Sequence, residues 1–370
     1  MAILISIVLL VLGLTFKKSR GLFIITIFFF WTLMTFIYNN ADQEVYLSRY
    51  YNPELWLNNS EFLFSLLINI CRKLGLNFIE YKGIISAIEI SLVGSTIWKY
   101  SKYPNVILIM YFLCPFEYHV SQVRFALATA VFVFALQYLF NDNSKKSGFG
   151  VTINEWKYIV GVLIASFIHT SAIFWILLLI AKKCSLRFNL IFMLLFNALI
   201  LYVISPSLIS KFLNLFGAAN RMSAYLSTAY QLSSSRTFGQ LKIVLVTAFF
   251  EILMCIIVLK YKNCFEDIDK IMLLLKMDII TLIIIGIILK YTSEMYRLQE
   301  GLILVNYIYL TNAIPIESFM KVKTNVYAFF VEILLIVFVF TLFNMKVLNS
   351  TNIYDVWYPM FQNNYLYELF

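Results

Sequence analysis

Five ionisable side chains lie inside or beside the most apolar stretches of this chain: Asp42, Glu61, Arg124, His169 and Arg297. An ionisable group near the bilayer core costs about 2.5–3.5 kcal/mol even on lenient scales, so it usually faces a protein interior or a water-filled cavity and often marks a substrate path. A carboxylate or an imidazole can accept a proton. A guanidinium group presents a fork that matches phosphate.

The two carboxylates each have a structural and a catalytic interpretation. Glu61 opens an apolar run directly after Ser60. Ser60 would then cap a helix, with Glu61 in the first turn, where the helix dipole favours an acid. Asp42 follows the second apolar segment in the stretch Y-N-N-A-D-Q-E-V-Y. It is either a solvated loop acid or a general base, and Glu61 is the second candidate for catalysis.

Arg124 and His169 lie in apolar stretches, where ionisable side chains are unusual. Arg124 begins a long segment and is followed by small residues that allow close helix packing (Ala126, Ala128 and Ala130). It either extends from a helix end toward water or binds phosphate. His169 lies in the apolar stretch A-S-F-I-H-T-S-A. It is either a core histidine bonded to a neighbouring helix or a general base or hydrogen-bond donor.

Further arginines occur later in the chain. Arg221, Tyr225 and Arg236 belong to a long polar connection. Aromatic residues with scattered arginines suit a sugar-binding surface, and they also suit an interfacial belt. Arg297 has an acid, Glu300, three residues later, which predicts a helix-surface ion pair. The alternative for Arg297 is a second phosphate contact.

The segments that must position these residues are apolar and helical. The 370 residues are 61% hydrophobic with a mean hydropathy of +0.82. Apolar runs recur at lengths that reach or approach the ~30 Å of a bilayer core, and they lack the alternation of a barrel strand. We therefore predict an all-α, polytopic membrane protein of about 11–13 transmembrane or re-entrant helices. The expected segments are 2–16 (a retained helix rather than a signal peptide), 21–38, 60–75, 83–98, 104–118, 122–140, 157–181, 188–206, 241–259, 271–290, 297–314 and 326–345.

Basic clusters predict the orientation of a single membrane domain spanning 1–370, with a C-terminal tail at 346–370. Lysines and arginines favour the cytoplasm, so the cluster at 17–20 places loop 39–59 outside, and later clusters place 207–240 outside. Strict alternation then puts Lys145 and Lys146 outside and Arg124 inside, against the charge rule. A segment that enters and returns would restore the parity. The candidates are 60–75, 104–118 with its Pro115, and a turn at His169.

Composition and motifs exclude several other classes. The net charge of +9 lies in juxtamembrane clusters, which favours topology signals over nucleic-acid binding. The five cysteines show no C-x-x-C spacing of a zinc site. Asp267-Ile268-Asp269 is a D-x-D triplet without the surroundings of a nucleotide-sugar site. No P-loop or dinucleotide fingerprint occurs. We expect no cofactor and no metal.

Taken in order, these positions resemble the EpsG family of bacterial exopolysaccharide proteins, related in role to Wzy-type polymerases of capsule and O-antigen. The resemblance covers most of the chain from Asp42 to Pro315 and rests on short motifs: Asp42 with Tyr46 and Tyr50, the Glu61 to Phe64 stretch, V-R-F-A-L-A at Arg124, F-I-H-T-S-A at His169, R-M-S-A-Y-L at Arg221, and Tyr296-Arg297 through Ile314-Pro315. Phe62 and Phe125 depart from the family, which usually has Pro and Gln there.

The resemblance implies a glycosyltransferase in the bacterial cytoplasmic membrane. It would transfer a growing glycan from undecaprenyl pyrophosphate to a lipid-linked repeat unit at the outer leaflet. Expected partners are that lipid-linked oligosaccharide, membrane lipids, a chain-length regulator and a flippase. Asp42, His169 and Glu61 would be catalytic; Arg124, Arg221, Arg236, Arg297 and Tyr225 would bind pyrophosphate or sugar.

Three other functions compete with polymerisation. A flippase for the same lipid would show symmetric halves around a central cavity, and no internal repeat is present. A membrane acyltransferase could also use an intramembrane histidine, but several arginines favour a pyrophosphate substrate. A ligase that hands the finished glycan to another acceptor uses nearly the same chemistry.

Overall fold

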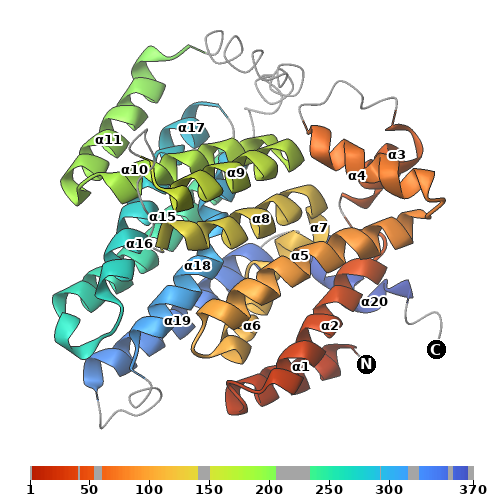
Figure 1. Cartoon of the computed structure of the whole chain (residues 1–370), viewed down its shortest axis with the longest axis horizontal. Coiled ribbons are helices and arrows are strands. Elements are labelled where there is room, and N and C mark those ends of the chain that lie inside the picture. The colour runs from red at the N-terminus through yellow and green to blue at the C-terminus, as the bar shows by residue number, and fades with distance from the viewer. Residues whose placement is uncertain are drawn as a thin grey trace.

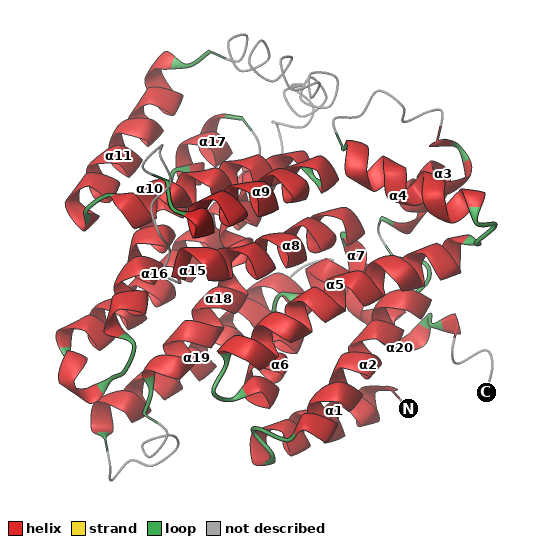
Figure 2. Ribbon diagram, in the orientation of Figure 1, coloured by secondary structure: helices red, strands yellow, loops and turns green. Residues whose placement is uncertain are grey.

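The computed structural model describes residues 2–40, 42–53, 61–140, 151–205, 234–291, 293–315, 325–348 and 353–365, without the side chains of 234–236, 293 and 294. Helices joined by short loops make up this part of the chain, as Figure 2 shows. An isolated bridge between Ile37 and Asn364 is the sole extended pairing among the described residues. The predicted all-α class is confirmed.

The helices lie at the predicted apolar segments, but 104–118, 157–181 and 271–290 are each divided, and further helices form in the predicted loop 39–59 and the predicted tail 346–370. They are α1 (Ala2–Thr15), α2 (Arg20–Phe36), α3 (Gln43–Tyr51), α4 (Phe62–Lys73), α5 (Phe78–Tyr100), α6 (Pro104–Leu113), α7 (Phe116–Ser121), α8 (Val123–Phe140), α9 (Ile153–Ile168), η2 (Thr170–Leu177), α10 (Leu178–Lys183), α11 (Leu186–Ala198), η3 (Leu199–Val203), α15 (Ser234–Lys260), η4 (Lys262–Cys264), α16 (Ile268–Thr281), α17 (Ile284–Lys290), η5 (Ser293–Tyr296), α18 (Arg297–Ala313), α19 (Val326–Phe343), η6 (Asn344–Leu348), η7 (Ile353–Trp357) and α20 (Tyr358–Gln362).

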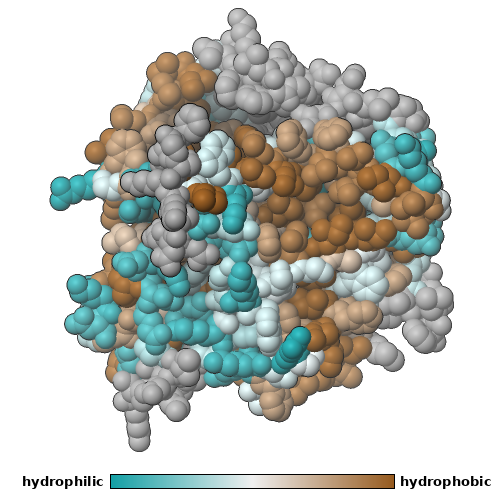
Figure 3. Space-filling model, in the orientation of Figure 1, coloured by the Kyte–Doolittle hydropathy of each residue, from teal (hydrophilic) through white to brown (hydrophobic). Residues whose placement is uncertain are grey.

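Five helical stretches of the described chain are long and apolar enough to cross a membrane: Val123–Phe140, Leu186–Val203, Thr237–Lys260, Ile268–Lys290 and Val326–Leu348. Ala2–Thr15, Arg20–Phe36 and Pro104–Leu113 are shorter apolar helices. α8 and α18 form the centre of the bundle, since nearly all their residues are buried. α11 instead exposes large apolar side chains, as expected for a face toward lipid. In Figure 3, hydrophobic residues cover most of the upper right of one face, while hydrophilic residues gather toward the lower left.

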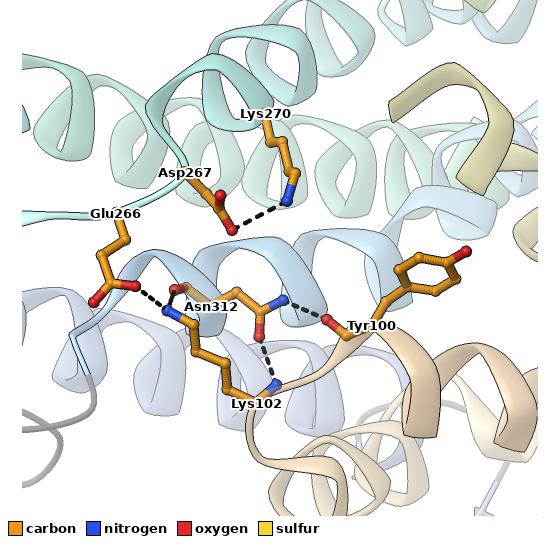
Figure 4. A network of polar contacts seen from close by, with 6 residues as sticks. All are labelled: Tyr100, Lys102, Glu266, Asp267, Lys270 and Asn312. Atoms are coloured by element: carbon orange, nitrogen blue, oxygen red, sulfur yellow. Dashed lines mark hydrogen bonds and ion pairs between the residues drawn. The ribbon is translucent and has the colours of Figure 1, made fainter. Parts of the chain in front are cut away.

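Several loops meet at one end of the bundle, which we call the lysine-rich end. Lys102 follows α5; its ammonium lies 2.6 Å from Glu266 Oε2, and its backbone N–H donates to Asn312 Oδ1 at 2.8 Å. The Asn312 amide also donates to the carbonyl of Tyr100 (Figure 4). These contacts join the end of α5, the loop before α16 and the end of α18.

Other loops belong to the same end. The amide of Asn105 donates to the carbonyls of Phe16 and Ser19, between α1 and α2. Near the end of α8, the Gln137 amide oxygen accepts from Lys99 at 3.3 Å. The cluster 17–20 and the lysines at 99, 102, 260 and 262 therefore lie at one end, which the positive-inside rule assigns to the cytoplasm.

The opposite end carries Arg49, Arg124 and Arg297, and we call it the arginine end. Here the end of α2 pairs with the C-terminal residues: Tyr38 N–H donates to the carbonyl of Asn363 at 2.9 Å. α8 begins at this end, and α3 and α4 lie close to each other there in the upper right of Figure 1. Because the lysine clusters lie at the other end, we expect this end at the outer face.

The predicted segment 157–181 is not one helix but a hairpin. α9 stops at Ile168, His169 adopts an extended conformation, and η2 with α10 runs back. At the open end of the hairpin, the carboxylate of Glu155 lies 3.2 Å from Lys183 Nζ. Midway along, the hydroxyl of Tyr158 donates to the carbonyl of Trp175 at 2.6 Å. His169 therefore forms the tip of the hairpin, so of the alternatives left open by the sequence, the turn at His169 is present.

Trp175 of η2, in the returning half of the hairpin, packs against α8 and α18 at the centre of the bundle. Its ring stacks on Phe132 of α8 at a centroid distance of 4.0 Å, and its indole N–H donates to the carbonyl of Leu298 at 3.1 Å. Gly301 of α18 permits this approach, because a Cβ there would lie 2.7 Å from Trp175 Cζ2. The returning limb is thus packed against α8 and α18, where non-helical backbone at membrane depth is tolerated, whereas α9 keeps an exposed apolar face.

The predicted segment 60–75 also fails to cross the bundle. α4 has 12 residues and is roughly 18 Å long, well short of a ~30 Å hydrocarbon core. Glu61 before it contacts Arg49 of α3, and Leu76 after it accepts a hydrogen bond from the Tyr50 hydroxyl. Burial raises the pKa of Tyr50, which keeps this phenol a donor. Both ends of α4 therefore lie against α3.

These two departures together remove the conflict in orientation. If 60–75 does not cross, α8 runs from the arginine end to the lysine-rich end. If the hairpin also returns, Lys182 and Lys183 stay at that end. Either departure alone would predict basic clusters on the outer side, so the charge rule requires both departures. The third candidate, 104–118, is broken at Pro115 but still connects the two ends through α6 and α7.

The hairpin predicts a specific labelling pattern. In a variant whose five native cysteines are replaced by serine, single cysteines at Asn154 and Ser185 should both react only with a reagent that reaches the cytoplasmic side. A cysteine at Glu44, which is exposed on α3, should react from outside. Labelling of positions 154 and 185 from opposite sides would show a crossing segment and contradict the hairpin.

Candidate functional site

At the arginine end, one buried carboxylate lies between two guanidinium groups. Glu61 occupies the N-cap position of α4, but its side chain makes no capping hydrogen bond. Its Oε2 atom lies 3.5 Å from Arg49 Nη1 and forms a close ion pair with Arg124 Nη1. The carboxylate is almost wholly buried, whereas the Arg124 side chain retains 17% exposure. The Arg124 side chain is therefore the more exposed partner of this pair.

Aromatic rings hold Arg124 in place. Its guanidinium lies 5.6 Å from the ring centroid of Tyr46 and 6.0 Å from that of Phe64, within the range of cation–π attraction. The backbone N–H of Arg124 also donates to the Tyr46 hydroxyl at 3.4 Å. α3, α4 and α8 therefore each contribute to the position of this one side chain.

A single aromatic ring, Phe125, brings two other predicted site residues together. Its ring lies 5.7 Å from the imidazole of His169 at the hairpin tip. The guanidinium of Arg297, at the start of α18, lies 5.8 Å from the same ring. Since Phe125 directly follows Arg124, the beginnings of α8 and α18 and the tip of the hairpin meet at one place. His169 is also hydrogen-bonded through Nδ1 to the Ser171 hydroxyl at 2.9 Å.

Asp42 lies one turn from this group, at the start of α3. Its carbonyl accepts from the N–H of Tyr46 at 3.2 Å, and its side chain does not cap the helix. Residues on both sides of it line a small hollow: Asn40, Gln43, Tyr46, Phe78, Tyr81, Lys82, Ser121 and Val123. These side chains offer hydroxyl, amide and ammonium groups next to Arg124, a set suited to hydrogen bonding with a polar ligand.

Three of the predicted binding residues cannot be placed in this way. Arg221 and Tyr225 lie outside the described residues. Arg236 belongs to the first turn of α15, and its side chain is outside the described part. The structure therefore pairs Glu61 with Arg124 and places His169 and Arg297 on either side of Phe125, with Asp42 nearby. Arg221, Tyr225 and Arg236 stay predictions.

Two of the structural alternatives raised by the sequence are wrong. Glu61 is not a first-turn acid within a helix, because its carboxylate is turned to Arg49 and Arg124. Glu300 is not on a helix surface: it is 2% exposed and lies 3.7 Å from Lys346 Nζ. Asp267, the first acid of the D-x-D triplet, forms an ion pair with Lys270 at 3.2 Å (Figure 4). This pair lies at the lysine-rich end and not with the arginines.

Sequence reasoning missed Arg49 as a partner in the site. It lies in the stretch Y-L-S-R-Y between two tyrosines, and helical spacing places it three residues after Tyr46 on the same face. That spacing was the available signal. A buried histidine, His119, was also missed: its Nδ1 lies 2.7 Å from the Tyr111 hydroxyl and 3.1 Å from Glu89.

Comparison with known proteins identifies the family. Residues 20–359 match the EpsG family, which is most of the 370-residue chain. No match was found among curated proteins or among solved structures. The apolar helices and the family agree on a multi-pass membrane protein. The chain therefore belongs to the EpsG family, whose membership points to a membrane exopolysaccharide function of the polymerase type.

Proposed function

We propose that the protein polymerises a lipid-linked oligosaccharide at the outer face of the bacterial cytoplasmic membrane. A growing glycan on undecaprenyl pyrophosphate is the donor, and a single repeat unit on the same carrier is the acceptor. The observation that carries this proposal is the adjacency of two clusters at the arginine end: Arg124, paired with the Glu61 carboxylate, is followed in the chain by Phe125, whose ring lies near Arg297 and His169. Polymerase-type family membership supports it.

The reaction needs charge stabilisation and one proton transfer. A hydroxyl oxygen of the acceptor sugar attacks the anomeric carbon of the donor, and the bond from that carbon to the pyrophosphate oxygen breaks. Negative charge develops on the leaving phosphate, and we assign its stabilisation to Arg124 and Arg297. The hydroxyl proton passes to a carboxylate, for which we propose Asp42. His169 is proposed to donate a hydrogen bond to the leaving group.

Glu61 was a candidate for the proton acceptor, and its surroundings favour another role. Two guanidinium groups on one carboxylate oxygen stabilise the ionised form, which makes a carboxylate a weak base. We therefore propose that Glu61 holds the arginines and that Asp42 is the base. This keeps the acid–base group and the phosphate-binding group on separate elements, α3 and α8.

The test is reconstitution of the purified full-length protein in liposomes that contain only the lipid-linked repeat unit. We expect a ladder of longer lipid-linked glycans without added nucleotide. A flippase would move the repeat units across the bilayer without lengthening them. Unchanged single units in the presence of folded protein, with transbilayer movement, would replace the polymerase assignment by transport.

A further inference from the structure

The carboxylate of Glu61 is positioned as a phosphate oxygen would be. A single atom, Oε2, faces Nη1 of Arg49 at 3.5 Å and Nη1 of Arg124 in a close pair. Carboxylate and phosphate oxygens accept from guanidinium groups in the same planar geometry. The Glu61 and Arg49 side chains are 1% and 5% exposed. Two guanidinium groups arranged about one small anion therefore form a binding site that is already filled from within the chain.

We infer that Arg49 and Arg124 together form an anion site for the pyrophosphate of the lipid carrier, and that Glu61 fills this site in the resting protein. This inference rests on the proposed function, and it adds Arg49 to the site and a competing internal ligand. A pyrophosphate carries more negative charge than a carboxylate, so its attraction to two guanidinium groups is the stronger of the two.

The surroundings allow the carboxylate to leave without loss of the site. Arg124 keeps its contacts with the rings of Tyr46 and Phe64, and its backbone N–H stays on the Tyr46 hydroxyl. The Glu61 side chain has no capping bond to α4 that would be broken. The resting ion pair also explains how two arginines persist in a buried place before substrate arrives, since unpaired buried charges are costly.

The decisive variant is Glu61→Gln, which preserves shape but removes the competing charge. A residue with only a structural role would weaken binding when changed. A competing internal ligand would instead make binding tighter. We expect the detergent-solubilised full-length variant to bind inorganic pyrophosphate about tenfold more tightly than the wild type, a typical size for coupling between two ligands. Without ligand, its melting temperature should fall, because the two arginines lose their counter-charge.

The matched control is Glu155→Gln at the lysine-rich end. Glu155 also lies between two basic side chains, Lys182 and Lys183, so the change in net charge is identical. Glutamine can still serve in the capping box that Glu155 forms with Thr152. Pyrophosphate affinity should not change in this variant. An equal gain in both variants would show a general charge effect and overturn the inference.

Three further measurements make the outcome unambiguous. If Glu61→Gln is poorly stable, the rise in its melting temperature with pyrophosphate is compared with that of the wild type; a larger rise is expected, and an equal or smaller one would overturn the inference. In the Glu61→Gln background, Arg49→Gln should abolish the gain. Phosphatidylglycerol is tested in parallel, and a gain for that phosphodiester alone would assign the site to lipid headgroups instead.

These binding measurements do not require turnover. A gain in pyrophosphate affinity in a protein that never elongates glycan would refute polymerisation and keep the anion site. Elongation by a protein whose Glu61→Gln variant binds pyrophosphate more weakly than the wild type would keep polymerisation and refute the internal ligand. The two proposals therefore fail separately.

Discussion

Arg124→Lys should lose most polymerisation, although the charge is conserved. The guanidinium of Arg124 contacts Glu61 and the rings of Tyr46 and Phe64 at once, and it retains partial exposure for a further ligand. An ammonium group is a point charge that cannot present two parallel donors to a phosphate. Hydrogen bonds to charged groups contribute about 1.5–3 kcal/mol, which corresponds to a loss of roughly 10- to 150-fold in the elongation rate.

The measurement is the length distribution of lipid-linked glycan formed by reconstituted protein at equal abundance. Arg187→Lys is the matched control, because Arg187 is exposed at the opposite end of the bundle. It should leave the distribution unchanged. Wild-type polymer length in Arg124→Lys would remove the guanidinium fork from the mechanism.

The bundle itself was predictable because burial in lipid dictates it. Apolar runs of helical length fix the class, since lipid offers no partner for unpaired backbone groups. The same reasoning could not tell a crossing helix from a hairpin. In segment 157–181 the sequence left a turn at His169 as one of three alternatives, and the contacts of Glu155 with Lys183 and of Tyr158 with Trp175 show that the chain turns back there. These contacts join residues whose pairing leaves no local pattern.

The residues of the candidate site were found by a simpler argument, the cost of charge in an apolar setting. This argument selected Glu61, Arg124, His169 and Arg297, which the fold brings to one end. It could not assign partners, because the Arg49–Glu61 pair crosses from α3 to α4. It also did not identify buried charges that pair with each other inside the bundle. Glu300 and Lys346 neutralise each other within the bundle, 46 residues apart in the sequence.

The buried ion pairs of this protein are of two kinds, which differ in how much the cation is exposed. The Glu300–Lys346 pair has both side chains at 1% exposure or less, so it is closed to solutes. Arg124 reaches the surface while its partner Glu61 does not. A buried pair that is open on the cationic side can exchange its anion, whereas a closed pair serves packing alone. This difference in exposure is the physical reason to look for substrate at the arginine end.

Asp42→Asn should reduce the elongation rate by roughly 10²–10⁴, the usual cost of losing a general base. Asparagine keeps the shape of the side chain and cannot take the hydroxyl proton. Asp42 opens α3 one turn before Tyr46, which contacts Arg124, so a sugar bound beside the arginines would meet this carboxylate. We expect lipid-linked single repeat units to accumulate in cells that make normal amounts of the variant.

Glu44→Gln is the matched control for this prediction, because Glu44 is exposed on the same helix two residues away and loses the same charge. It should give normal polymer.

His169→Ala distinguishes a general base from a group that binds the phosphate. Loss of a hydrogen-bond donor to the leaving group should lower the elongation rate by about 10²–10³, and pyrophosphate affinity should fall as well. In Asp42→Asn that affinity should be preserved, since the base contacts the acceptor. Normal chain lengths in Asp42→Asn would exclude Asp42 as the base, and weakened pyrophosphate binding in that variant would place Asp42 with the arginines instead.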